Sequence, residues 1–327
     1  MQDFAQAKVF DQIPVIDLTP LLIENDPMSV AVKILEAATD IGFFYISGHG
    51  ISQDVIDQAF RVTADFFALS DVQKSTIAVN QHQRGWMGQG MSRLSGSKTH
   101  DLKEVFFWGA ETASDDPDLL AAKPLVAENQ WPDALFPRLR SELTPYYDAL
   151  CDVARHVMSA LALSLDQPAD RFAPSYEKPL ARGQLVYYPP STAKDELEER
   201  FGVAPHTDFG VLTFLLQDNS GGLQVQLRSG EWVAAPPIPG TLVCNIGDLL
   251  QRWSNDRFRS TLHRVINRSQ SARYSIPIFF DPHTDCVVDP KDLGVSDIHC
   301  RYEPITAGSY IMGRNKQSFS QYQEDNA

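Results

Sequence analysis

Short segments rich in β-branched and aromatic residues, separated by turn signals, fill the chain after Arg182. The pattern predicts strands over residues 184–188, 212–217, 223–227, 231–234, 241–245, 263–266 and 274–280. Glycine, proline and asparagine at 219–222 and 239–240 are among the turn signals that divide them. Many short strands at even spacing are typical of a β-sandwich or barrel, so residues 176–290 are predicted to form such a core.

Helices are expected mainly ahead of this core. Asp26 followed by Pro27 predicts one helix start, and Ser52 predicts another. A long helix is expected from about 134 to 165, where apolar residues recur on one face, with a kink or break at Pro145. The patterns divide one compact unit into a helical and strand region over 1–175, the β core over 176–290 and a C-terminal extension over 291–327.

The charge balance limits the partners that this chain is expected to bind. The 327 residues include 42 acidic and 28 basic ones, which gives a formal net charge of −14. Such a chain is a poor partner for nucleic acid or an anionic membrane, so a small molecule is the expected ligand. The four cysteines form no Cys-x-x-Cys motif, no apolar run has the length of a membrane span, and no signal peptide is evident. A cytoplasmic location is therefore expected, and the oligomeric state stays open.

His206 and Asp208 stand two residues apart in a region of predicted strands. Side chains at positions i and i+2 of a strand point to the same face, so an imidazole and a carboxylate are expected to converge. A later predicted strand contains His263. Two histidines and one carboxylate form the facial triad of non-haem Fe(II) oxygen chemistry. A histidine–carboxylate pair alone is more often an ordinary polar pair, and the distant histidine favours the metal site.

Further motifs accompany this triad along nearly the whole chain. The N-terminal part contains Ile-Pro-Val-Ile-Asp-Leu at 13–18 and Gly-Phe-Phe-Tyr-Ile-Ser-Gly-His-Gly at 42–50. The later part contains Gly-Gly-Leu-Gln-Val at 221–225, Asn-Ile-Gly-Asp at 245–248, His-Arg-Val at 263–265 and Arg-Tyr-Ser at 273–275. In these motifs the sequence resembles the isopenicillin N synthase-like family of Fe(II)/2-oxoglutarate dioxygenases. The resemblance implies a mainly β fold with flanking helices, built on a distorted double-stranded β-helix, or jelly roll.

The same resemblance implies roles for individual residues. The two histidines and the aspartate of the triad match the iron ligands. Arg273 and Ser275 match the Arg-x-Ser motif that grips the distal carboxylate of 2-oxoglutarate, and Tyr188 stands where many members place a tyrosine that reaches the same carboxylate. A guanidinium offers a planar fork of donors to a carboxylate, and a hydroxyl two residues away on a strand shares its face. Val186 departs from plant relatives, which often have asparagine there.

The implied activity uses Fe(II), O2 and 2-oxoglutarate, and couples oxidative decarboxylation to hydroxylation, desaturation or cyclisation of a small-molecule substrate. One alternative is an oxidase of the isopenicillin N synthase kind, which works without 2-oxoglutarate and also keeps Arg-x-Ser. That subgroup has a glutamine ligand near its end, for which Gln317, Gln321 and Gln323 are candidates here. The other alternative is a non-catalytic jelly-roll binding or sensor protein, against which the complete triad argues.

Residues 84–107 are expected to border the substrate on the side away from Arg273. Their glycine, methionine, arginine and aromatic content is typical of an adaptable loop, with Arg84 and Met87 as the candidate substrate residues. An ordinary surface loop has the same composition. Asn245 and Asp248 are expected to fix a turn near the site.

Overall fold

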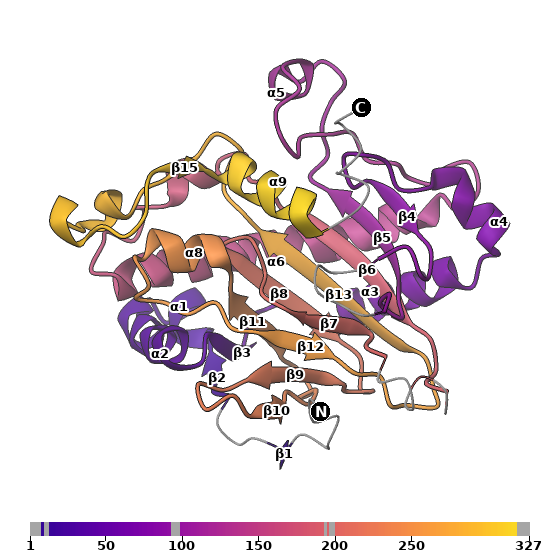
Figure 1. The fold of residues 1–327 in the computed structure, drawn as a ribbon, viewed down its shortest axis with the longest axis horizontal. Coiled ribbons are helices and arrows are strands. Elements are labelled where there is room, and N and C mark those ends of the chain that lie inside the picture. The colour runs from indigo at the N-terminus through magenta and orange to yellow at the C-terminus, as the bar shows by residue number, and fades with distance from the viewer. Residues whose placement is uncertain (1–7, 10–12, 93–98, 193–194, 196–199, 319–327) are drawn as a thin grey trace.

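The computed structural model describes residues 8–9, 13–92, 99–192, 195 and 200–318, and two β-sheets organise its backbone (Figure 1). The larger sheet has eight strands in the order β2-β3-β11-β8-β13-β6-β5-β4. These are β2 (Val15–Asp17), β3 (Phe43–Ser47), β4 (Gly85–Met87), β5 (Glu104–Gly109), β6 (Arg182–Tyr188), β8 (Leu212–Gln217), β11 (Leu242–Ile246) and β13 (Arg273–Phe280).

The smaller sheet has five strands in the order β1-β10-β9-β12-β7. They are β1 (Lys8–Val9), β7 (Val203–His206), β9 (Leu223–Gln226), β10 (Trp232–Ala234) and β12 (His263–Val265), and β14 (Val287–Val288) pairs separately with β15 (Ile305–Thr306). Neither large sheet closes into a barrel within the described residues. The seven strands expected after Arg182 are all present, with ends within two residues of the expected ones.

An apolar core fills the space between the two sheets. It includes Phe43, Tyr45 and Val243 from the larger sheet and Val225 and Val265 from the smaller one, all of them buried. Burial of a large apolar side chain stabilises a fold by roughly 1.5–3 kcal/mol. Because side chains alternate along a strand, the chain neighbours of Phe43, Tyr45 and Val243 face the other side of the larger sheet.

Three long helices cover that other side (Figure 1). They are α2 (Pro27–Asp40), α3 (Gln53–Phe67) and α6 (Arg138–Ser164). Both expected helix starts are confirmed, since Asp26 accepts a hydrogen bond from Ser29 N and Ser52 accepts one from Val55 N. Of the two outcomes expected at Pro145, a kink or a break, the break does not occur, because α6 continues through this residue. The side chains of Leu143 and Tyr146, on either side of the proline, are fully buried, and this packing holds the helix together.

Strands from the N-terminal region belong to the same sheet as the core strands. Tyr45 of β3 pairs with Val243 of β11, and Phe106 of β5 pairs with Leu185 of β6. The larger sheet therefore extends across the boundary expected at residue 175. The division into 1–175, 176–290 and 291–327 stays a prediction.

The remaining helices are short, apart from the last one. They are α1 (Thr19–Leu22), α4 (Asp71–Lys74), α5 (Pro117–Leu120), α8 (Asp248–Trp253) and α9 (Ala307–Ser318), with single 3-10 turns over Ser75–Ile77, Ala173–Tyr176, Pro290–Leu293 and Asp297–His299. The expected C-terminal extension thus includes a helix up to Ser318, which the buried Ala307 and Ile311 anchor. Within the described ranges, no helix is both long and apolar enough to cross a membrane.

Candidate metal centre

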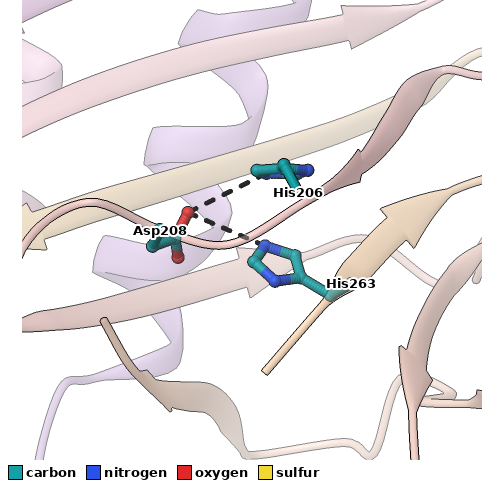
Figure 2. A group of neighbouring side chains, drawn as sticks. All are labelled: His206, Asp208 and His263. Carbon is teal, nitrogen blue, oxygen red and sulfur yellow. Dashed lines mark ion pairs between the residues drawn. The ribbon is translucent and has the colours of Figure 1, made fainter. Parts of the chain in front are cut away.

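His206, Asp208 and His263 come together between the two sheets (Figure 2). His206 ends β7, and His263 begins the neighbouring strand β12 directly opposite it. Asp208 Oδ1 lies 3.8 Å from His206 Nε2 and 3.7 Å from His263 Nε2. The three possible ligand atoms lie within 4.8 Å of one another, so a single ion can contact all three.

The cause of this convergence differs in part from the expected one. Strand β7 ends at His206, so Asp208 lies in the following loop rather than on a strand. Asp248 N donates a hydrogen bond to the Asp208 carbonyl oxygen at 2.7 Å, and Thr207 Oγ1 donates to Asp248 Oδ2 at 3.2 Å. Asp248 is the first residue of α8, and it fixes the loop that carries the carboxylate.

Both histidines present the same ring nitrogen to the centre. His206 Nδ1 lies 2.8 Å from the carbonyl oxygen of Ala204, and His263 Nδ1 lies 3.1 Å from that of Thr261. A carbonyl oxygen only accepts hydrogen bonds, so each Nδ1 carries the proton and each Nε2 keeps its lone pair for a metal. Burial, helped by the neighbouring His263, lowers the pKa of His206 to about 4, which keeps this imidazole neutral near pH 7.

The carboxylate of Asp208 is held through one oxygen. Thr213 Oγ1 and Asn245 Nδ2 donate hydrogen bonds to Oδ2 at 2.6 and 2.8 Å, while Oδ1 faces the two histidines. Burial works to raise the pKa of Asp208, but the two histidines and these two donors together lower it below its usual value. The side chain is therefore ionised and has an oxygen available for a cation.

Asn245→Ala is expected to weaken Fe(II) binding by roughly 10- to 100-fold, the usual effect of losing a group that orients a metal ligand. The sequence alone suggested only a turn for Asn245, and its bond to Asp208 gives it a direct positioning role. Titration of the purified variant with Fe(II) under nitrogen measures the change. Asn267→Ala is the matched control, since Asn267 donates to the Pro189 carbonyl instead. Equal iron affinities in the two variants would contradict the positioning role.

Gly210 lets a buried ion pair approach the loop of Asp208. Asp281 is fully buried, accepts a hydrogen bond from Val211 N at 2.7 Å, and pairs with Arg182 at 2.9 Å. A Cβ atom on Gly210 would lie 1.9 Å from Asp281 Oδ1, which is far inside contact distance. The absence of a side chain at 210 is thus required by packing.

Gly210→Ala is expected to lower the free energy of unfolding by about 3–5 kcal/mol, because the added methyl group displaces one partner of a buried pair. Denaturant unfolding measures the loss. Gly313→Ala, where no atom of the described residues outside the local helix backbone lies within 4 Å of the new Cβ, should be neutral or slightly stabilising. Equal effects of the two substitutions would show that position 210 has room for a side chain.

A buried guanidinium lies near the metal centre. Arg273 and Ser275 point to the same side of β13 and are both buried, and Tyr188 stands opposite Arg273 on β6 with its ring centre 4.6 Å from the guanidinium carbon. Arg273 donates to Gly221 O at 2.6 Å and to Ser275 Oγ at 3.3 Å. No carboxylate among the described residues pairs with it. A buried cation with only neutral partners is costly, so the surroundings of Arg273 suit an anionic ligand.

Two adjoining cavities surround the triad. The first is lined by all three triad residues together with Arg273, Ser275 and Tyr188, so it connects the metal centre to the buried guanidinium. Its walls also include the apolar Val186, Leu215 and Leu223. The second cavity is lined by His206, Asp208, Phe209, Phe279 and Asn315 and does not reach Arg273. The triad residues His206 and Asp208 therefore line both cavities, and Arg273 lines one of them.

Arg84 and Met87 lie away from both cavities, in contrast to the expectation for substrate residues. Arg84 is buried and donates to three backbone carbonyl groups, and Met87 belongs to the core between the sheets. The two ends of the expected loop are strands, since β4 pairs with β5, while the described residues 88–92 and 99–103 between them lie outside any strand. Among the described residues of 84–107, Lys103 lines the cavities. Composition alone did not distinguish Lys103 from its neighbours.

A second cluster of possible metal ligands contains Asp118, His283 and Asp285. Lys123 Nζ and Lys178 Nζ already lie 2.6 and 2.5 Å from the two oxygens of Asp118. These ammonium groups, Lys123 foremost, hold the pKa of Asp118 well below its usual range. The cluster is therefore a charge-compensated network of ion pairs rather than a set of ligands awaiting a cation.

Two neutral imidazole nitrogens and one carboxylate oxygen leave the other positions around a bound ion open. This arrangement is typical of non-haem Fe(II) oxygenases. The two-sheet core and the buried guanidinium in a shared cavity fit the same class. The structure therefore defines a non-haem iron oxygenase of the jelly-roll type.

Comparisons with known proteins agree with this class. Residues 13–134 match the family described as non-haem dioxygenase in morphine synthesis N-terminal, and residues 183–282 match the 2OG-Fe(II) oxygenase superfamily. A 2-oxoglutarate-Fe(II) type oxidoreductase from Emericella nidulans is 35% identical over 317 residues, which cover 94% of this chain and 90% of the relative. A homoarginine-6-hydroxylase from Oryza sativa is 33% identical over 332 residues, with 95% and 98% covered.

The fold is also similar to that of a Neurospora crassa protein crystallised with alpha-KG, at a TM-score of 0.83 and 27% identity over 95% of this chain and 98% of the other. The chain belongs to the 2OG-Fe(II) oxygenase superfamily, in its isopenicillin N synthase-like group. It is a 2-oxoglutarate-dependent Fe(II) oxygenase, and its two sheets form the expected double-stranded β-helix core.

Proposed function

We propose that His206 Nε2, Asp208 Oδ1 and His263 Nε2 bind the Fe(II) ion of this oxygenase. The observation that carries the proposal is how the three side chains are oriented. Each histidine uses Nδ1 for a backbone carbonyl, and Asp208 uses Oδ2 for Thr213 and Asn245. Each residue is thus left with one donor atom, and these three atoms lie close together.

The distal carboxylate of 2-oxoglutarate binds Arg273 and Ser275 in this proposal, and the hydroxyl of Tyr188 adds a third donor. The fully buried guanidinium without an anionic partner in the described chain supports it. The cavity that contains both Arg273 and the triad lets one diacid contact both. Val186 contributes an apolar wall where asparagine often stands, so no side-chain amide from that position contacts the cosubstrate.

Fe(II) and 2-oxoglutarate supply, with O2, the oxidative chemistry that attacks a substrate C–H bond and leads to hydroxylation, desaturation or cyclisation. The chain itself orients the reactants. Phe43 packs edge-on against His263, with ring centres 5.2 Å apart, and limits rotation of that imidazole. The apolar walls exclude water and strengthen the attraction between Arg273 and a carboxylate.

The substrate is a small molecule that binds in the second cavity, beside Phe209 and Phe279. Relatives support this class, since one is named for homoarginine hydroxylation and the Neurospora crassa protein was also crystallised with thymine. The oxidase alternative requires a glutamine ligand. Gln317 is exposed on α9, and Gln321 and Gln323 lie outside the described residues. The cytoplasmic location and the lack of a nucleic-acid partner stay predictions from sequence.

A turnover assay tests the proposal. The Fe(II)-loaded protein is mixed with a panel of small metabolites, and O2 uptake and succinate formation are recorded with and without 2-oxoglutarate. We expect succinate and O2 uptake in equal amounts, and both only when 2-oxoglutarate is present. O2 uptake at an unchanged rate without 2-oxoglutarate would instead support the oxidase alternative.

A further inference from the structure

The second cavity at the triad contains several polar side chains that the proposed iron and 2-oxoglutarate sites do not use. Its lining includes Gln83, Lys103, Arg182, Gln184 and Asn315. Arg182 already pairs with the buried Asp281. Apart from the triad aspartate, the described lining residues include no carboxylate. A cationic substrate group would therefore find no free counter-charge in this part of the cavity.

Lys103 is a cation of this lining with unused donors, whereas Arg182, whose Nε also has no hydrogen-bond partner among the described residues, is already neutralised by the buried Asp281. Its side chain is 10% exposed, and Nζ lies 3.2 Å from Asp101 Oδ2, the one polar partner it has among the described residues. The carboxylate of Asp101 also accepts hydrogen bonds from Ser92 Oγ and Ala204 N. An ammonium group has three N–H donors, so Lys103 keeps donors for a ligand. Because Lys103 lines both cavities, it lies where substrate and metal centre meet.

Asn315 and Gln184 add two amide groups. Asn315 is 2% exposed on α9, and its Nδ2 has no hydrogen-bond partner in the described chain. Its neighbour Arg314 pairs with Asp248 at 2.8 Å and stacks on Phe209 at 4.6 Å, which fixes α9 over the loop of the triad aspartate. Buried amide groups are normally paired, so a ligand that accepts from Asn315 explains its position.

We propose that the substrate of this oxygenase is a small carboxylic acid whose anionic group binds Lys103, with the amides of Asn315 and Gln184 as further donors. Its apolar part packs against Phe209 and Phe279, which line the same cavity. The inference rests on the proposed function, because it assumes that 2-oxoglutarate occupies the Arg273 site. Lys103 and Asn315 then determine specificity and take no part in binding the iron.

Matched pairs of ligands test the charge preference. The protein is loaded with redox-inert Zn(II), which accepts the same nitrogen and oxygen ligands, and saturated with 2-oxoglutarate. Ligand-observed NMR then measures the binding of hexanoic acid, phenylacetic acid, 4-phenylbutyric acid and N-acetylphenylalanine, and compares each with its neutral primary amide. At least one acid should bind roughly 10-fold or more tightly than its amide, the usual effect of a hydrogen bond to a charged group.

Lys103→Met is expected to remove most of this preference. Lys74→Met is the matched control, because Lys74 is also a buried lysine but pairs with Glu104 at 2.6 Å and lines neither cavity. The control should keep the preference. Asn315→Leu leaves the Lys103–Asp101 pair intact and should weaken binding of the acid by a smaller factor. This variant therefore tests the proposed acid site if Lys103→Met does not fold.

The proposal is overturned if no acid of the panel binds better than its amide, or if the preference for the acid is unchanged in both Lys103→Met and Asn315→Leu. Binding of 2-oxoglutarate is measured on the same samples. If the acid preference is missing while 2-oxoglutarate binds normally, only the substrate class is wrong. A wild-type protein that does not bind 2-oxoglutarate would contradict the proposed function instead.

Discussion

His263→Ala should lower the affinity of the protein for Fe(II) by more than about 100-fold and reduce turnover to background. Loss of a group that only orients a metal ligand already lowers metal affinity by roughly 10- to 100-fold, and this substitution removes a proposed ligand itself. The remaining His206 and Asp208 cannot replace it, since His263 Nε2 approaches from the opposite strand. Titration with Fe(II) under nitrogen and the iron content after dialysis measure the effect.

His283→Ala is the control for this experiment. His283 belongs to the other histidine–carboxylate cluster, with its Nε2 3.1 Å from Asp118, and its loss should leave iron binding unchanged. Normal iron content in His263→Ala, or loss of iron in His283→Ala, would show that the ion binds elsewhere.

Arg273→Ala should weaken 2-oxoglutarate binding by about 30-fold or more while Fe(II) binding stays normal. Loss of one partner of a buried, hydrogen-bonded charge pair costs roughly 2–5 kcal/mol. Each tenfold change in affinity corresponds to about 1.4 kcal/mol. Anaerobic titration of the Fe(II)-loaded variant with 2-oxoglutarate, followed by its weak visible charge-transfer band, gives the affinity for comparison with the wild type.

Arg264→Met is the control that separates the loss of a cosubstrate contact from the effect of removing any buried arginine. Arg264 is as buried as Arg273, but it donates to Gln224 and stacks on Trp232 at 4.1 Å, and it does not line the cavity. Its replacement should leave the affinity for 2-oxoglutarate within a fewfold of normal. If Arg273→Ala binds 2-oxoglutarate as tightly as the wild type, the cosubstrate binds at another site.

Local patterns in the sequence were sufficient for much of the fold. Turn residues and β-branched segments predicted the strands after Arg182, and the caps Asp26 and Ser52 predicted two helices. The spacing of Arg273 and Ser275 correctly placed both on one face of a strand. Each of these features depends on residues that are close in the sequence, where backbone geometry alone decides the outcome.

Contacts between distant segments were not predictable in the same way. Asn245 reaches Asp208 from 37 positions away because β11 and the loop after β7 meet at the centre. Lys103 and Asn315 line the cavity for similar reasons. Arg84 lies in a segment whose composition is typical of a binding loop, yet its guanidinium donates to the backbone carbonyl groups of His82, Gln83 and Leu125. Tertiary packing decides such positions, and a single sequence does not encode it in a short pattern.

The most direct test of the site is a crystal structure of the protein prepared under nitrogen with Fe(II) and 2-oxoglutarate, with anomalous data collected at the iron edge. We expect one iron peak in contact with His206 Nε2, Asp208 Oδ1 and His263 Nε2, and a 2-oxoglutarate carboxylate on Arg273 and Ser275. An iron peak at Asp118 and His283, or an iron-loaded triad with 2-oxoglutarate bound away from Arg273, would contradict this expectation.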